Sequence, residues 1–593
     1  MKKILFLILS VAAFVGCTLD EKIYSSSVPE SYYQTVPQCK TGLNGCYINL
    51  KSLYGNGDYF ETCEVAADLI YHNSDSYYDA MCNYTQSIPR FATNIWNHCY
   101  QGVMRCNAMY VAIERSPLSD DEKAPLFAEC EILRAFYYYI LTINFGDVPY
   151  YFEEVTDANN DKISQLPRMS ATDLRDQLMA NLEHWLIEKQ ALPYIKTYDP
   201  ANEYRIGAMV GFMIAGKLAM WNKDWDKAIK YYSYIEAVYG CADSEGAYSP
   251  KFALTGGDRS NPVYSIKELM FRNRYIPESI FELPGYAKDY GLRVTHALAS
   301  RCTPSRSSSE TEGGDLGTGE DDVEMEDDTV DLSKKDDMYN GIRIPELGAS
   351  ARTTSPYLPT YYMWKTLMGN KTPDGKANTD KRRSVYDANK FSADNIVEVE
   401  DGGGWLAWCY AGWTKDENME TVGRHMLYFS QTKTSDGVPF LGDKFWCPGM
   451  VYNQDSNNVR IFRFAGVLLD LAEANMWMGN WDMANAYLNA TRYRAGLDDV
   501  GINDQDDFME ELQKESAREL FGEFNRRHSL VRWGIWHKQV TEFARCGSAG
   551  TTKCDIVSYV TDYPCRQYYP IPDQQIVLSN YKLDNKEYDK YGL

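Results

Sequence analysis

Residues 401–413 read DGGGWLAWCYAGW and place three tryptophans and a tyrosine behind three consecutive glycines. Aromatic faces stack on the C–H faces of sugar rings, so such a stretch suits a carbohydrate platform. Read as a β-strand, the stretch puts Trp405 and Trp413 on one face and Trp408 on the other. Both faces are then apolar, which is typical of a strand covered on both sides. Trp405 and Trp408 are therefore only secondary candidates for ligand contact.

Motifs for catalysis or metal binding are missing from the chain. The seven histidines form no HExxH motif, and neither a GxSxG elbow nor a GxxxxGK[ST] phosphate loop occurs. Asp157-x-Asn159-x-Asp161 begins like a calcium loop, but the pattern fails at Lys162 and Arg168. The 83 acidic residues offer too many carboxylate pairs to single out a glycosidase site. We predict no catalytic residue, no metal site and no cofactor, with a surface glycan-active enzyme as an alternative.

The N-terminus predicts export. Two lysines precede an apolar run from Ile4 to Phe14, and Gly16 and Cys17 follow, which is the pattern of a signal peptide. The run is too short to cross a bilayer. Phe14-Val15-Gly16-Cys17 resembles the lipobox of bacterial lipoproteins, so we expect a signal peptide over 1–16, lipidation of Cys17 and a tether over 17–35. A soluble secreted protein is the alternative. The acidic Thr18–Lys22 stretch resembles the surface-display signal of Bacteroidetes lipoproteins.

Composition narrows the class of partner. A formal net charge of −23 argues against nucleic acid and anionic lipid surfaces. Hydrophobic residues at 44% and aromatics at 14% describe a globular chain. No CxxC pair occurs. Cys39 and Cys46, and likewise the group Cys546, Cys554 and Cys565, are close enough in sequence for disulfides, with free buried thiols as the alternative.

Helices dominate the two ends of the chain. Residues 126–145 are apolar nearly all round, as in a buried helix, and Gly146 serves as its C-terminal cap. A second helix is predicted over 206–221 and another over 461–478. After each of these two helices comes Trp-Asp-x-Ala-x-x-Tyr, at 225–231 and again at 481–487. This repeat resembles a tetratricopeptide hairpin and predicts a mainly α scaffold of stacked helix pairs.

The predicted organisation has three parts. An N-terminal helical half covers 36–250, and a C-terminal helical region with a closing motif covers 456–593. Between them, 251–455 is rich in Gly, Pro, Ser and Asn and reads as an irregular, loop- and short-strand-rich, ligand-facing region. Within it, 310–337 carries thirteen acidic residues against two lysines, which is typical of a solvated loop, although calcium binding stays open.

Four segments resemble the SusD/RagB family of Bacteroidetes outer-membrane nutrient-binding lipoproteins. They are FAECEILRAFYYYILTINFGDVPYY (127–151), NVRIFRFAGVLLDLAEAN (458–475), ESARELFGEFNRRHSLVRWG (515–534) and YYPIPDQQIVLSN (568–580). The resemblance covers essentially the whole mature chain. Gly466, Ser529 and Gln575 depart from the family pattern, all in segments that we interpret as scaffold. Arg518, Arg526 and Arg532 are expected to fasten neighbouring helices through carboxylates or carbonyls.

The resemblance implies a non-catalytic role. Family members sit as a lid on a SusC-like TonB-dependent receptor in the outer membrane, capture oligosaccharides or peptides at the cell exterior, and pass them inward. It also implies a ligand ledge built from three loops, here 71–84, 285–291 and 351–362. The candidate ligand-binding residues on these loops are Asn73, Asp75, Tyr77, Tyr78, Tyr286, Tyr290 and Tyr357. A helical scaffold that binds only protein partners is a further alternative.

Overall fold

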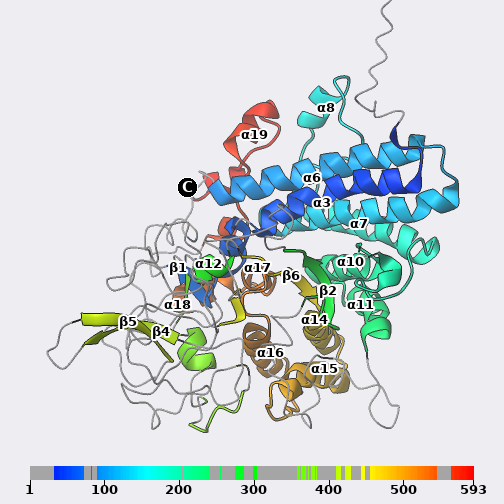
Figure 1. Ribbon diagram of the computed structural model, residues 1–593. Coiled ribbons are helices and arrows are strands. Elements are labelled where there is room, and N and C mark those ends of the chain that lie inside the picture. Colours follow the sequence, from blue (N-terminus) through cyan, green and yellow to red (C-terminus); the bar gives the residue numbers. More distant parts are fainter. Residues whose placement is uncertain are drawn as a thin grey trace, which may run out of the picture.

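The computed structural model describes residues 32–55, 57–72, 82, 90–203, 205–240, 254, 274–285, 298–302, 357–360, 362–368, 372, 375–380, 382, 409–415, 421–428, 443–445, 447, 455–543 and 563–592. Within these ranges the fold is mainly helical, as the sequence predicts (Figure 1).

Four helix pairs stack along the chain as a solenoid. They are α3 (Val36–Gly55) with α6 (Arg90–Arg115), α7 (Asp120–Phe145) with α9 (Ala171–Glu183), α10 (Ala208–Asn222) with α11 (Trp225–Tyr239), and α14 (Phe464–Trp477) with α15 (Trp481–Arg494). Figure 1 shows α3, α6 and α7 lying together above the remaining pairs. α16 (Gln505–Glu519) covers the last pair. The TPR-like arrangement predicted from the sequence is thus confirmed.

The ends of α7 illustrate why these segments form helices. Ser119 caps the first turn, and its hydroxyl and the Glu122 carboxylate form a reciprocal capping box. At the other end Gly146 has φ 69°, and its N–H donates to the carbonyl of Thr142. The predicted cap is confirmed at Gly146, while the helix begins at Asp120, six residues before the predicted start.

The Trp-Asp-x-Ala repeat has the same contacts in both copies. Ala228 and Ala484 are fully buried where the paired helices cross. The Tyr231 hydroxyl donates to Glu183 on the preceding pair at 2.9 Å, and the Tyr487 hydroxyl donates to Glu236 at 2.8 Å. Each tyrosine therefore fastens its helix pair to the one before it.

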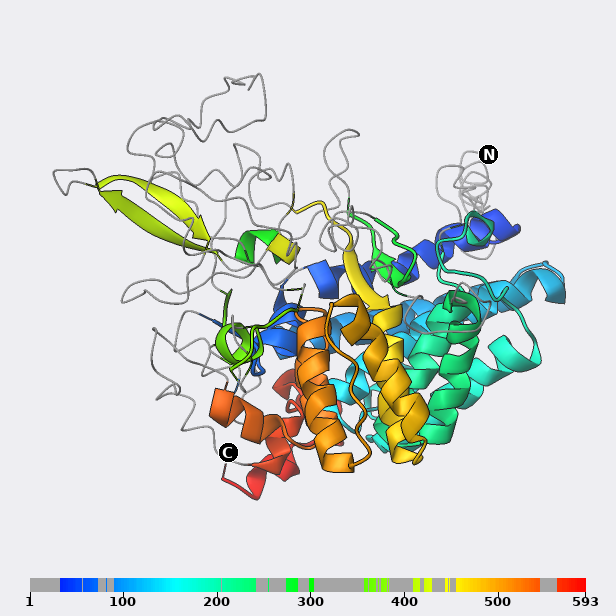
Figure 2. The same cartoon turned by 90° about the horizontal axis from the view of Figure 1, so that it is seen from below.

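Short strands form three separate two-stranded antiparallel ladders. β1 (Ile70–His72) pairs with β3 (Tyr357–Pro359), β2 (Ser279–Leu283) with β6 (Val459–Arg463), and β4 (Cys409–Lys415) with β5 (Thr421–Tyr428). β4 confirms that the second half of the 401–413 stretch is a strand, whereas Trp405 and Trp408 lie outside the described residues. The β4–β5 hairpin extends away from the helical body in both ribbon views (Figure 2).

The outer edge of β2 is closed by tyrosine hydroxyls. The hydroxyl of Tyr198 donates to the Glu282 carbonyl at 3.0 Å and also accepts the Glu282 N–H, so one side chain occupies both backbone groups. The Tyr239 hydroxyl donates to the carbonyl of Ser279 at 2.9 Å. Tyrosines from the helical half thus take the place that a neighbouring strand would otherwise fill.

Shorter elements complete the fold. They are α4 (Asp58–Phe60), a π-helical turn (Glu61–Val65), α8 (Asn160–Ser164), π-helical His184–Glu188, 3₁₀ turns at Pro200–Asn202, Asp443–Phe445 and Pro564–Gln567, α12 (Leu298–Cys302), π-helical Tyr362–Leu367, α17 (Arg526–Arg532), α18 (Trp536–Phe543), α19 (Asp573–Leu578) and α20 (Lys586–Asp589). No helix in the described part of the chain combines the length and apolarity that a bilayer crossing requires.

The cysteines of the described residues are free thiols. Cys39 and Cys46 are both buried and unpaired, so the disulfide that their spacing allowed is wrong and the free-thiol alternative holds. Cys565 is likewise free and buried. Cys546, Cys554 and the expected lipidation residue Cys17 lie outside the described residues.

Candidate functional site

Two of the three expected ligand loops leave the same end of one β-ladder. His72, the last residue of β1, pairs with Tyr357, the first residue of β3. The 73–80 segment follows His72 directly, and the 351–356 segment leads directly into Tyr357. The antiparallel ladder therefore holds the roots of both segments side by side. It is extended by a hydrogen bond from the Thr360 N–H to the carbonyl of Leu69, at 2.9 Å.

The third expected loop is held at both roots by the segment that leads into β6. The Gly285 N–H donates to the side chain of Asn458 at 3.1 Å, just before residues 286–290. On the far side, the Ala299 N–H at the start of α12 donates to the carboxylate of Asp455 at 3.0 Å. Only two residues lie between Asp455 and Asn458. The 286–297 segment therefore begins and ends at one short stretch of chain.

A polar triad, in which Glu61 and Tyr357 are buried and Arg301 is partly exposed, joins α12 to the β1–β3 ladder. Arg301 of α12 donates to the carboxylate of Glu61 at 2.9 Å and to the hydroxyl of Tyr357 at 2.8 Å, and the same hydroxyl donates to Glu61 at 2.5 Å. Burial, reinforced by the charge of Glu61, raises the pKa of Tyr357 well above its ordinary value, so the hydroxyl stays protonated. Through this triad the roots of all three loops are tied to one another.

The expectation that Tyr357 is an exposed ligand contact is wrong. Its side chain is fully buried, its ring packs near Phe60 with centroids 5.5 Å apart, and its hydroxyl is taken by Glu61 and Arg301. Tyr357 is a structural residue at the root of the ledge because β3 pairs with β1 and turns its side chain inward. The other candidates, Asn73, Asp75, Tyr77, Tyr78, Tyr286 and Tyr290, lie outside the described residues and stay predictions.

Glu64 and Asp68 fasten the start of the ledge to the C-terminal motif region. Glu64 is fully buried and accepts three backbone N–H groups, from Gly522 at 3.1 Å, Asn525 at 2.6 Å and Arg526 at 3.1 Å. Burial raises its pKa to about 7, although these hydrogen bonds oppose the shift. Asp68 receives two hydrogen bonds of 2.7 Å from the guanidinium of Arg526.

The predicted fastening role is confirmed for Arg526 and Arg532, whereas Arg518 pairs with a carboxylate of its own helix, α16. Besides Arg526 on Asp68, Arg532 donates to Glu473 at 2.6 Å and Arg518 donates to Glu515 at 3.0 Å. α16 ends at Glu519, so Glu523 lies in the following turn. There Glu523 accepts from Arg463 at 2.7 Å, and this contact lowers its pKa to about 2 against the effect of burial.

A buried ionic cluster extends this network into the middle region. Arg382 is fully buried and donates to Asp380 at 2.7 Å, to Glu515 at 2.7 Å and to Glu519 at 3.0 Å. Lys444 donates to Glu523 at 2.8 Å and to the carbonyl of Phe521. No sequence pattern singled out Arg382 or Lys444, because the carboxylates of Glu515, Glu519 and Glu523 that they meet are far away along the chain.

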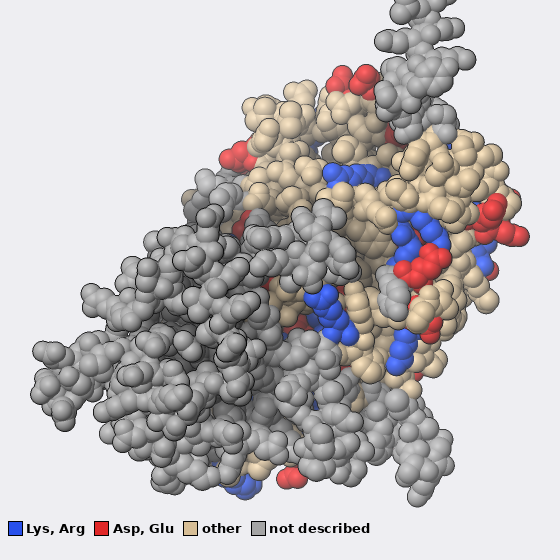
Figure 3. Space-filling model, in the orientation of Figure 1, with Lys and Arg blue, Asp and Glu red and all other residues tan. Residues whose placement is uncertain are grey.

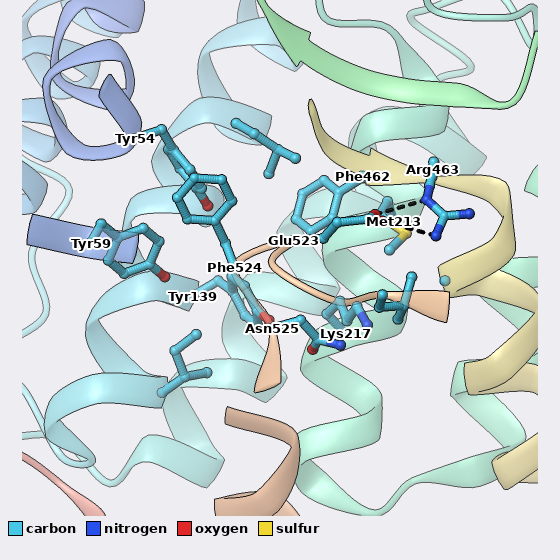
Figure 4. Close-up of a pocket in the computed structure, with 14 residues that line it drawn as sticks. Tyr54, Tyr59, Tyr139, Met213, Lys217, Phe462, Arg463, Glu523, Phe524 and Asn525 are labelled. Atoms are coloured by element: carbon cyan, nitrogen blue, oxygen red, sulfur yellow. Dashed lines mark hydrogen bonds and ion pairs between the residues drawn. The ribbon is translucent and has the colours of Figure 1, made fainter. Parts of the chain in front are cut away.

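The void shown in Figure 4 is part of the scaffold. It measures about 40 Å³ and lies between the rings of Tyr54, Tyr59 and Phe524, with Arg463 and Glu523 paired at its wall. Ligand pockets run from about 300 to 1,000 Å³, so this void is too small for a sugar ring. In the part of the chain that the structure describes, no group of His, Cys, Asp or Glu side chains could hold a metal ion.

Gly285 offers a test of the ledge's foundation. A methyl group there would lie 2.5 Å from the backbone carbonyl oxygen of Ser456, which cannot move aside without shifting the loop root. We expect Gly285→Ala to lower the free energy of unfolding by about 1–3 kcal/mol and to weaken ligand binding. Gly501→Ala, where a methyl group meets nothing within 4 Å, is the matched control. Equal ligand affinity in both variants would show that this root does not position the site.

The described fold is a solenoid of helix pairs that gathers the roots of three loops at one corner. Matches to known protein families agree with this class of structure. The model of the SusD family matches residues 278–588, and a second model, described as starch-binding and associating with the outer membrane, matches residues 19–184. The chain belongs to the SusD family.

Relatives with solved structures share the fold. A SusD superfamily protein from Bacteroides vulgatus superposes with a TM-score of 0.60 at 18% identity, covering 93% of this chain and 98% of its own. The surface glycan-binding protein A from Bacteroides thetaiotaomicron, solved in complex with laminarihexaose, gives 0.58 at 18% identity over 92% and 98%. SusD-like protein P2 from Formosa agariphila is 24% identical over an alignment of 407 residues, and this alignment covers 63% of this chain and 74% of that protein.

Proposed function

We propose that this protein is a cell-surface lipoprotein that captures oligosaccharides and passes them to a SusC-like TonB-dependent transporter in the outer membrane. The observation that carries the proposal is the convergence of three loop roots on the Arg301–Glu61–Tyr357 triad. Loops that start at one corner of a rigid scaffold can present several side chains to one extended ligand. Family membership and the glycan-binding proteins of the same fold support the same conclusion.

The proposed role involves binding and transfer of the ligand and no catalysis. Tyrosine rings on the 73–80 and 286–290 segments stack on sugar faces, while Asn73 and Asp75 contact hydroxyl groups. Lipid on Cys17 holds the protein at the membrane, facing outward, and transport energy is supplied through the receptor. Deleting the receptor should abolish uptake by cells while the purified protein still binds its ligand. Any product released from a bound oligosaccharide by the purified protein would favour the enzyme alternative.

The test is calorimetric titration with oligosaccharides, laminarihexaose among them, and with peptides of similar length. We expect one oligosaccharide class to bind the wild type and the Tyr78→Ala/Tyr290→Ala variant to bind it at least about tenfold more weakly, since each lost stacking contact costs roughly 1 kcal/mol. Tyr581→Ala is the matched control, because Tyr581 is 71% exposed at the turn after α19. Binding of peptides alone would favour the peptide alternative. Silence with every ligand would favour a protein-binding scaffold.

A further inference from the structure

A second concave site lies between the helical half and the end of β2. It measures about 400 Å³, within the range of small-molecule pockets, and is bounded by α3, by residues 197–206 and by residues 281–284. In Figure 1, α3 crosses above β2 on the face turned toward the viewer. The candidate ledge residue Tyr286 comes only two residues after Pro284 at the edge of this cleft.

The floor of the cleft is apolar. Phe281, Leu283 and Ile206 contribute buried apolar side chains, and Ile48 stands at the mouth with 52% of its surface exposed. An aliphatic side chain this exposed beside a concave apolar surface provides contact area that a ligand would cover.

The two tyrosine hydroxyls that face the floor already have partners. The hydroxyl of Tyr47 donates to Glu129 at 2.5 Å and accepts the N–H of Ile206 at 3.3 Å. The hydroxyl of Tyr198 is taken by the backbone of Glu282. A sugar buried here would lose water from its hydroxyl groups and gain few hydrogen bonds in return, because Thr197 Oγ1 is the one buried oxygen of the described lining that has no partner. The cleft therefore suits flat, apolar groups packed against the rings of Tyr47, Tyr198 and Phe281.

Charge at the cleft is balanced except at one residue. Glu203 pairs with Lys40 at 2.7 Å, Arg205 pairs with Glu129 at 2.6 Å, and Glu282 pairs with Arg460 at 2.8 Å. Lys51 of α3 is exposed, and of the charged residues lining the described part of the cleft it alone has no ion pair. Figure 3 shows positive and negative side chains interspersed over the helical part of this face.

We propose that this cleft binds a small aromatic carboxylate, with the ring on the apolar floor and the carboxylate beside Lys51. The apolar floor selects the ring, and the unpaired ammonium group at the mouth selects the negative charge. The inference stands apart from oligosaccharide capture, because it uses none of the ledge residues.

The experiment titrates the full-length mature protein with 2-naphthoate and with its neutral analogue 2-naphthamide, by calorimetry. The wild type should bind naphthoate saturably and several-fold more tightly than naphthamide. Ile48→Asp should weaken naphthoate binding about tenfold, because it removes apolar contact and adds a repelling charge. Lys51→Gln should bind both compounds about equally. These two substitutions are at exposed positions, so unchanged melting temperatures should confirm that the fold is intact.

Val577→Asp and Lys582→Gln are the matched controls, since both residues are exposed near α19 and neither lines the cleft. Naphthoate binding that is absent from the wild type, or that Ile48→Asp weakens no more than Val577→Asp does, would overturn the site. A preference for naphthoate that persists in Lys51→Gln would overturn the anionic class of ligand. None of these outcomes depends on whether the protein binds an oligosaccharide.

Discussion

Replacing Arg382 with methionine should lower the free energy of unfolding by about 3–5 kcal/mol, the cost of removing one partner from a buried ion pair. The guanidinium is fully buried and donates to Asp380, Glu515 and Glu519. Burial alone disfavours its charge, but the carboxylates of Asp380 and Glu515 outweigh burial and raise its pKa. Methionine fills similar space and leaves these carboxylates facing one another without the cation.

Urea denaturation of Arg382→Met beside Lys230→Met measures this effect. Lys230 is 48% exposed and pairs with Glu183, so its loss should cost no more than about 1 kcal/mol. The contrast isolates burial as the cause, because both substitutions remove one cation from an ion pair. If the two variants were equally stable, the cluster around Arg382 would not contribute as its geometry indicates.

The second large effect is a pH dependence that belongs to Glu64. Its pKa of about 7 in the folded protein lies above the ordinary carboxyl value of 4.5, chiefly because of burial. Between these two values the folded state binds the proton and the unfolded state does not. The stability that Glu64 contributes is therefore fully present below about pH 4.5 and is lost as the pH rises through 7.

The glutamine side chain in the Glu64→Gln variant does not titrate. The free energy of unfolding of this variant should therefore not show the decrease with rising pH that Glu64 causes in the wild type. We expect the stability of the wild type relative to the variant to fall by up to about 1.4 kcal/mol per pH unit, and by about 3 kcal/mol from pH 4.5 to 7. Chemical denaturation at steps of half a pH unit measures the difference.

Glu203→Gln is the control, since Glu203 is exposed and its pKa is lowered by Lys40, which leaves it ionised throughout this window. Parallel profiles for wild type and Glu64→Gln would contradict the assignment. Lys444, whose burial lowers its pKa to about 8, titrates above the window.

Local patterns predicted the helical part of the fold well. The buried face of α7, the cap at Gly146 and the Trp-Asp-x-Ala repeat are set by residues within a few turns of one another. Four motifs in the right order were enough to identify the family. The arginines of the third motif proved to be structural because each meets a carboxylate, although the sequence did not show which one.

The candidate site was harder to predict because its contacts are distant in sequence. Tyr357 looked exposed among polar neighbours, but it pairs with His72 and binds Glu61, almost three hundred residues earlier. Arg382 and Lys444 carried no periodic signal, and each meets a carboxylate on α16 or in the turn after it that is remote in sequence. Pairing between remote segments depends on the tertiary fold, which local propensity does not encode.

The closed edge of β2 also limits how a peptide could be recognised. Peptides often bind by strand addition, in which their backbone completes an open sheet edge regardless of side-chain identity. Here Tyr198 occupies both backbone groups of Glu282, and Tyr239 occupies the carbonyl of Ser279. At these positions of β2, a passing polypeptide would have to displace a tyrosine hydroxyl to reach the backbone. At this edge of β2, discrimination between one chain molecule and another would then depend on side chains, which are the part of a binding surface that sequence divergence can alter most freely.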